Sequence, residues 1–147
     1  MPGRIAIFQG HPDPAGGHFC HALARAYAEG AKAAGHELRE FDLAKIEAFL
    51  EQALRPGFAI GTVGADKRWV KLLGGRSARL VVTMGMPAFV YRWYFGSHGL
   101  KGLERNVLRF CGIGPIRETL IGNVEGMRAA RREQLLLDLR ALGQAAR

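Results

Sequence analysis

Strand-like runs alternate with helix-like segments along this chain, and no other feature constrains the fold as strongly. Short runs rich in β-branched and aromatic residues occupy residues 4–10, 36–43, 78–85 and 116–124. Each run is followed by a segment whose apolar residues recur at helical spacing. Alternation of this kind predicts an α/β fold, with a parallel sheet that helices cover on both faces.

The helical spacing is clear in four segments. Residues 19–35 carry an apolar residue at every fourth position, and residues 46–54 follow the i, i+3, i+4, i+7 pattern of a helix that faces a core. Residues 100–111 and 127–143 are amphipathic in the same way. Residues 58–77 show neither period, so we expect an irregular segment with at most one short helical turn.

Length and composition indicate one ordinary domain over residues 1–147. The chain is 48% hydrophobic and 23% charged, as globular proteins are, and it contains no obvious linker or repeat. No apolar run is long enough to span a membrane, and the first ten residues do not resemble a secretory signal. We therefore expect a cytoplasmic protein. Cys20 and Cys111 lie too far apart in sequence to suggest a disulfide framework or a zinc ribbon.

The formal net charge of +8 raises the question of a polyanionic partner. The basic residues are spread along the chain, and the densest group, in residues 127–134, fits the solvated face of a helix. No nucleic-acid recognition motif accompanies them. We therefore expect no nucleic-acid partner.

Two loops are the places to look for a ligand, because open parallel sheets bind ligands at the carboxyl ends of their strands. The first, residues 9–18, leads into the start of a helix, where free backbone N–H groups attract phosphate. Its glycines fit neither the P-loop nor the GxGxxG pattern. Phosphate binding and a solvated helix cap both remain open on this evidence.

The histidines of the same loop raise a metal hypothesis. His11, His18 and His21 lie close in sequence, but apart from Asp13 no acidic or thiolate ligand obviously converges on them. Histidines near a helix start are more often cap or surface residues. We therefore predict no metal site.

The second loop, residues 83–98, combines glycine and proline with several aromatic residues. Backbone amides at a glycine turn can hold the polar edge of an aromatic heterocycle, and Tyr91 or His98 can donate a proton to a substrate being reduced. Hydrophobic packing, including packing across a dimer interface, explains the same residues. The loop composition alone does not choose between these readings.

Three segments taken together cover most of the chain: IAIFQGHPDPAGGHFCHALA, FLEQALRPGFAIG and ARLVVTMGMPAFVYRWYFGSHGLKGLERNVLRFCGIGPIRETLIGNVEGM. They resemble the NAD(P)H dehydrogenase (quinone) family of flavodoxin-like flavoproteins, which includes quinone reductases and ancillary oxidoreductases of potassium-efflux systems. The resemblance implies a flavodoxin-like three-layer sandwich, bound FAD or FMN, and a homodimer. It also implies hydride transfer from NAD(P)H through the flavin to a quinone-like acceptor, and an association with a membrane transport system.

The resemblance also implies roles for individual residues. At the phosphate end of the flavin it places His11, His18, Phe19 and Cys20, although the family more often has a hydroxyl residue, Phe and Asn at the last three positions. Along the isoalloxazine and at the site of hydride transfer it places two further sets: Thr83, Met84, Gly85 and Met86 as cofactor contacts, and Tyr91 and His98 as catalytic residues.

One family segment is missing from this chain. After the second strand, family members continue into a very hydrophobic third strand and a Trp-rich loop such as PLWW, whereas here FDLAKI runs straight into a helix. The absent βα unit is roughly 30 residues or more. We therefore predict an internal deletion that leaves four strands in the order 2-1-4-5. The alternative function is a non-catalytic remnant, an interaction or regulatory subunit that has lost flavin binding.

Overall fold

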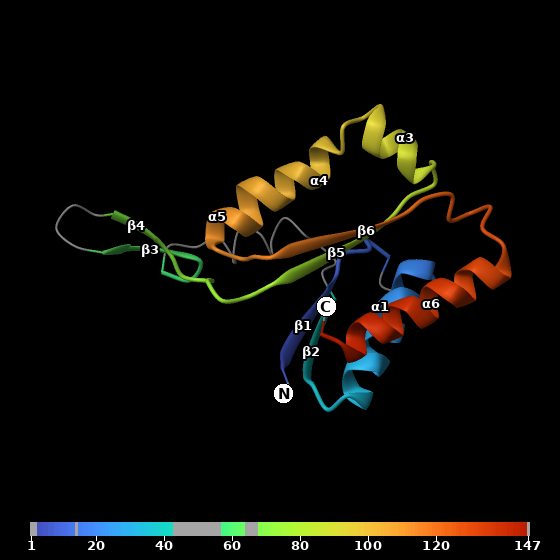
Figure 1. Ribbon diagram of the computed structural model, residues 1–147, viewed down its shortest axis with the longest axis horizontal. Helices are drawn as coiled ribbons and strands as arrows, with labels where there is room; N and C mark the ends of the chain where they lie inside the picture. The colour runs from blue at the N-terminus through green and yellow to red at the C-terminus, as the bar shows by residue number, and fades with distance from the viewer. Residues whose placement is uncertain (1–2, 14, 43–56, 64–67, 147) are drawn as a thin grey trace. The chain divides into compact units, whose positions relative to one another are not determined.

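The computed structural model describes residues 3–13, 15–42, 57–63 and 68–146, and they fall into two compact units. The first unit joins residues 1–46 to residues 125–147, and the second is residues 47–124. Figure 1 shows the helices and strands of both. One domain over residues 1–147 stays a prediction.

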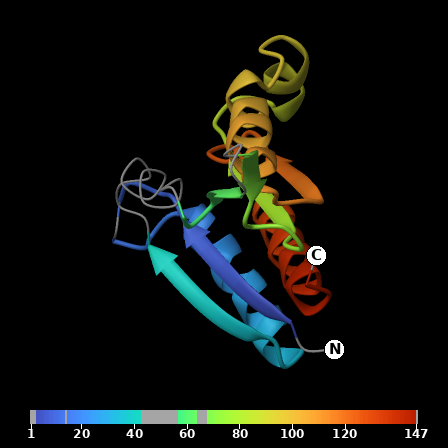
Figure 2. The same cartoon turned by 90° about the vertical axis from the view of Figure 1, so that its left-hand side faces the viewer.

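The first unit contains one parallel strand pair and two helices. Strand β1 (Arg4–Gln9) pairs in parallel with β2 (Glu37–Asp42), in a register that sets Arg4 opposite Glu37. Helix α1 (Phe19–Ala33) connects them, as expected from residues 19–35, and α6 (Ala129–Gln144) matches the terminal helix expected over 127–143. Figure 2 shows β1 and β2 side by side, with α1 beside them.

Helices α1 and α6 pack closely because glycines lie where they cross. A β-carbon at Gly30 would collide with the Arg140 carbonyl, and one at Gly143 would collide with the Tyr27 carbonyl. Leu23 and Leu139 are fully buried in this unit. Burying each such leucine contributes about 1.5–3 kcal/mol, so the helix pair supplies much of the core of the first unit.

The second unit is built on strands β5 (Ala78–Thr83) and β6 (Ile116–Ile121). They are parallel, and their register runs from Ala78 opposite Ile116 to Thr83 opposite Ile121. Both strands match the runs predicted at 78–85 and 116–124.

The connection from β5 to β6 is helical. Helix α3 (Ala88–Trp93) follows the aromatic loop, and after a turn a longer helix runs through α4 (His98–Gly102), η1 (Leu103–Leu108) and α5 (Arg109–Cys111). Segment η1 is a π-helical turn, a distortion that often marks functional sites. The long helix confirms the one predicted over residues 100–111.

The expectation for residues 58–77 was wrong. Strands β3 (Ile60–Val63) and β4 (Arg68–Lys71) form an antiparallel pair there. The Leu72 amide extends the pairing by donating to the Ala59 carbonyl at 3.0 Å. β-branched residues at the paired positions favour extended backbone, and the intervening glycine and charged residues hid the alternation.

The α/β class with parallel strands is confirmed, and the sheet has few strands. All four predicted strands are present, and the pairs 2-1 and 4-5 of the expected order are β2–β1 and β5–β6. In the described residues, hydrogen bonds join the strands within each pair, and the adjacency of strands 1 and 4 in the expected order stays a prediction. The helix expected at 46–54 lies outside the described residues. None of the described helices has both the length and the hydropathy needed to cross a membrane.

Candidate functional site

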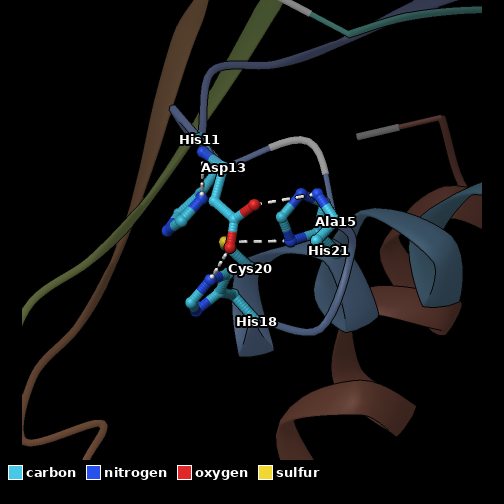
Figure 3. A network of polar contacts seen from close by, with 6 residues as sticks. All are labelled: His11, Asp13, Ala15, His18, Cys20 and His21. Carbon is cyan, nitrogen blue, oxygen red and sulfur yellow. Dashed lines mark hydrogen bonds and ion pairs between the residues drawn. The ribbon is translucent and has the colours of Figure 1, made fainter. Parts of the chain in front are cut away.

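The loop between β1 and α1 is organised around one carboxylate, as Figure 3 shows. The backbone amide of Asp13 donates to Nδ1 of His11 at 3.1 Å, and the Ala15 amide donates to Oδ1 of Asp13 at 2.9 Å. The other carboxylate oxygen, Oδ2, lies 2.8 Å from Nε2 of His18. Hydrogen bonds from Ala15 and His18 lower the pKa of the Asp13 carboxyl from its ordinary value.

Three imidazoles gather beside this carboxylate. The rings of His11 and His18 stack with their centroids 4.1 Å apart, and His21 lies 5.2 Å from His11. Cys20, in the first turn of α1, places its Sγ 3.7 Å from Nδ1 of His21. One ligand atom from each of His11, Cys20 and His21 lies within 4.8 Å of the others.

The sequence signal for this cluster was visible, but its thiolate was missed. The spacing of the three histidines raises a metal hypothesis, but the sequence alone does not show a thiolate that converges on them. The structure brings His11, from the loop after β1, to Cys20 and His21 in the first turn of α1.

The start of α1 also offers backbone donors. The amides of Phe19 and Cys20 lie ahead of the first helical hydrogen bond, which the His21 amide donates to the His18 carbonyl at 3.0 Å. His18 is the N-cap residue, and its side chain makes no capping hydrogen bond. Added β-carbons at Gly16 or Gly17 would meet nothing within 4 Å. An anionic group such as a phosphate therefore fits the open N-terminus of α1.

The second loop is held by backbone contacts. After β5, the Met84 amide donates to the Ile121 carbonyl at 2.9 Å, and the Met86 carbonyl accepts from the Asn123 amide at 3.1 Å. The Val124 amide donates to the Met84 carbonyl at 3.3 Å. These bonds continue the pairing of β5 with β6 past the ends of both strands.

Gly122 lets the two segments come together. A β-carbon there would collide with the Ala88 amide nitrogen and would lie 2.6 Å from the Met86 carbonyl oxygen. Only glycine fits at such a close approach of two backbones. Gly122 thus fixes the path of the chain from Met86 into α3.

The same loop has donors to spare. In the described part of the chain, the amides of Gly85 and Met86 have no hydrogen-bond partner, and Gly85 and Met86 are exposed. Free amides on a fixed backbone can bind the carbonyl edge of a flat heterocycle. The predicted contact residues Thr83, Met84, Gly85 and Met86 therefore form one continuous backbone surface.

Tyr91 and His98 flank the tight turn between α3 and α4. Ser97 at this turn is buried and has a left-handed φ of 51°, and its amide donates to the Tyr91 carbonyl at 3.1 Å. A β-carbon on Gly96 would lie 2.8 Å from Nε2 of His98, and one on Gly99 would lie 3.6 Å from the Tyr91 hydroxyl. Both predicted proton donors thus lie along one four-residue turn.

A cavity of about 330 Å³ lies on the second unit. It is bounded by side chains of α3 and β6: Ala88, Phe89, Arg92, Trp93, Glu118 and Leu120. Aromatic walls with one cation and one carboxylate suit a flat, polar-edged ligand. The sequence does not point to Arg92 or Glu118, because Arg92 stands among the aromatic residues of the second loop and Glu118 lies inside a strand-like run.

The predicted site residues therefore fall into two groups. His11, His18, Phe19 and Cys20 lie on the first loop and the start of α1, in the first unit. The six predicted from Thr83 to His98 lie in the second unit, at the end of β5, on α3 and at the start of α4.

Comparison with known proteins agrees with this architecture. A family model described as a flavodoxin-like fold matches residues 44–142, which includes the second loop. No curated protein sequence matches the chain at a significant level.

Several solved structures share the fold. An NAD(P)H:quinone oxidoreductase from Methanothermobacter marburgensis superposes with a TM-score of 0.72 at 14% identity, with 100% of both chains covered. Smu.1420 from Streptococcus mutans UA159 gives a TM-score of 0.71 at 16% identity, with coverage of 97% of this chain and 99% of that one. An azoreductase from Bacillus anthracis str. Sterne gives 0.63 at 12% identity, with coverage of 99% and 98%.

Proposed function

Because the chain belongs to the family with the flavodoxin-like fold, we propose that it is a flavin-dependent oxidoreductase. In this proposal it passes hydride from NADH or NADPH through FAD or FMN to a quinone-like acceptor. The observation that carries the proposal is the backbone surface of Gly85 and Met86. It lies within the matched region, it is fixed by Gly122, and its amides are free.

The first loop supplies the phosphate end of the proposed site. The amides of Phe19 and Cys20 and the Nε2–H of His11 offer donors to phosphate oxygens at a helix N-terminus, and His18 holds the Asp13 carboxylate beside them. Asp13 opposes an anion here, but its carboxylate is engaged by His18 and the Ala15 amide. The loop therefore offers a phosphate several hydrogen-bond donors against one negative charge.

The second loop supplies the ring end. The free amides of Gly85 and Met86 hold the polar edge of the isoalloxazine, and the neighbouring backbone of Thr83 and Met84 lines the same side. A flavin held there would supply the hydride-transfer chemistry. The protein's own part is to hold the ring in one orientation.

Tyr91 and His98 act on the acceptor. Each carries an N–H or O–H group beside the 96–99 turn, where it can give a proton to an oxygen that gains electrons. Proton donation of this kind is worth about 10²–10⁴ in rate.

The acceptor class and the assembly complete the proposal. Two structures that share the fold are named as a quinone oxidoreductase and an azoreductase, which supports a flat, reducible acceptor. The aromatic cavity beside α3 suits such a molecule. We propose further that the protein is a cytoplasmic homodimer and that it associates with a membrane transport system.

The test is to add FAD or FMN to the purified chain, follow flavin fluorescence and visible absorbance, and then add NADPH or NADH. We expect one flavin per chain, bleaching on addition of the nicotinamide, and recovery of the absorbance when a quinone is added. A folded chain that binds neither flavin would refute the proposal. It would leave the alternative of a non-catalytic remnant that acts through a partner.

A further inference from the structure

We propose that His11, Cys20 and His21 form a binding site for a transition-metal ion of the Zn²⁺ class. One ligand atom from each of the three residues lies within 4.8 Å of the other two. The three come from two elements, the loop after β1 and the first turn of α1. The site goes beyond the proposed oxidoreductase function, because none of its evidence depends on a bound flavin.

The separations suit tetrahedral coordination. With Zn–N near 2.0–2.1 Å and Zn–S near 2.3 Å, two ligand atoms on one ion lie about 3.3–3.6 Å apart. Cys20 Sγ and His21 Nδ1 are already 3.7 Å apart. The remaining separations close by shifts of roughly 1 Å, within reach of side-chain rotation at half-buried positions.

The donor set selects the class of metal. Two imidazoles and one thiolate are intermediate to soft ligands, which bind Zn²⁺, Co²⁺ and copper and not Mg²⁺ or Ca²⁺. Three protein ligands leave a fourth position for water or another ligand, the arrangement of exchangeable zinc sites. The proposed site is therefore an open one.

Local charge makes the site tolerable at a helix N-terminus, where a lone cation is disfavoured. The Cys20 thiolate cancels one charge of a divalent ion, and the Asp13 carboxylate lies beside the stacked rings of His11 and His18. Together these two negative groups balance a +2 ion. Asp13 also fixes the orientation of His18, whose ring stacks on His11.

One existing hydrogen bond must change. Nδ1 of His11 accepts from the Asp13 amide at 3.1 Å, so the neutral ring carries its proton on Nε2. If Nδ1 of His11 coordinates the metal, it can no longer accept from the Asp13 amide. If Nε2 coordinates the metal, the Nε2 proton must leave the ring or move to Nδ1, and a proton on Nδ1 also breaks this bond. The loop before α1 therefore rearranges when metal binds, which gives a second, structural readout at the Asp13 amide.

The experiment is a calorimetric titration of the full, tag-free chain with ZnCl₂, in the absence of flavin. We expect one Zn²⁺ per chain with a micromolar or tighter Kd. Cys20→Ser and His21→Gln should each weaken binding at least tenfold, a loss of about 1.4 kcal/mol or more. Co²⁺ should give a thiolate charge-transfer band that Cys20→Ser abolishes.

The chain offers matched controls for both variants. Cys111 is buried, and burial raises the pKa of its thiol, so Cys111→Ala should leave Zn²⁺ binding unchanged. His36 bonds the Gly3 amide through Nδ1 at 2.8 Å, away from the cluster, and His36→Gln should also bind Zn²⁺ normally. Zn²⁺ should slow alkylation of Cys20 without changing that of Cys111.

Three results would overturn the site. They are no binding of Zn²⁺ or Co²⁺ by a folded chain, binding that Cys20→Ser and His21→Gln leave intact, and binding lost equally in the two control variants. Circular dichroism of each variant checks that the chain is folded. Because no flavin is present, failure here leaves the oxidoreductase proposal standing, and failure of flavin binding leaves the metal site standing.

Discussion

The loop after β1 and the loop after β5 each follow the carboxyl end of a parallel strand, yet they are held in different ways. The first is organised by side chains: Asp13 bonds His18, and the rings of His11 and His18 stack. The second is fixed by backbone hydrogen bonds to the chain beyond β6 and by the contact at Gly122.

This difference indicates that the two loops suit different kinds of ligand. Titratable and metal-binding side chains can respond to a charged ligand, so the first loop suits phosphate or a metal ion. The backbone surface of residues 83–86 presents the same amides whatever the side chains are. The second loop therefore suits a rigid ring that must be held in one orientation. The family match begins at residue 44, so it includes the second loop and leaves out the first.

The largest effect on stability is expected at Gly122, which fixes the backbone surface of the second loop. Gly122→Ala places a methyl group against the Ala88 amide and the Met86 carbonyl, which should destabilise the fold by about 2–3 kcal/mol. Flavin binding should be lost with it. Gly126→Ala is the matched control, since its β-carbon would meet nothing within 4 Å. Chemical denaturation of both variants measures the difference in stability. Equal stabilities would contradict the claim that position 122 must be glycine.

Next come the proton donors of the second unit. Tyr91→Phe and His98→Gln should each slow reduction of a quinone by the reduced protein roughly 10²-fold, without changing flavin affinity. Stopped-flow measurement of flavin reoxidation follows this step alone. Tyr94→Phe is the matched control, because Tyr94 lies just after α3 and is 82% exposed. If the flavin is reoxidised at the unaltered rate in Tyr91→Phe and in His98→Gln, neither residue is a proton donor.

A smaller effect is expected at the side-chain loop. His18→Asn should raise the Kd for FMN about tenfold, because the Asp13 carboxylate then loses its partner and repels the phosphate; a hydrogen bond to a charged group is worth roughly 1.5–3 kcal/mol. Riboflavin has no phosphate, so its Kd should not change. His36→Asn serves as the control histidine. If His18→Asn weakens riboflavin as much as FMN, the loop does not bind the phosphate.

The smallest effect is a pH dependence at Asp13. Its pKa is lowered in the folded protein, so it contributes stability above the unfolded value of 3.8, and this contribution is lost as the pH falls through the folded value. Asp13→Asn should therefore lower Tm slightly at about pH 6 and not at about pH 2. Thermal scans of the unaltered chain and of Asp13→Asn test this, with Asp138→Asn as the control variant. A difference in Tm between the first two that persists in acid would contradict the prediction.

Periodicity was enough to predict the four parallel strands. The runs at 4–10, 36–43, 78–85 and 116–124 are all strands, because each is short and rich in β-branched residues. The β3–β4 pair was not predicted because each strand has four residues, too few for alternation to show.

The contacts that build the candidate sites could not be predicted in the same way. That Cys20 Sγ faces His21 and His11 depends on how the loop returns over the first turn of α1. That position 122 must be glycine depends on which backbone passes it, and the neighbours, Met86 and Ala88, lie more than thirty residues away in sequence. Spacing along a sequence carries no information about such approaches.

The most direct test of the central claim, that this chain binds a flavin and its phosphate, is to titrate the unaltered chain with FMN and with riboflavin. The two ligands share the ring and differ only in the phosphate. We predict that both bind and that FMN binds at least about tenfold tighter, as expected for charge-assisted hydrogen bonds at the start of α1. Equal affinities, or no binding of either ligand by the folded chain, would contradict the claim.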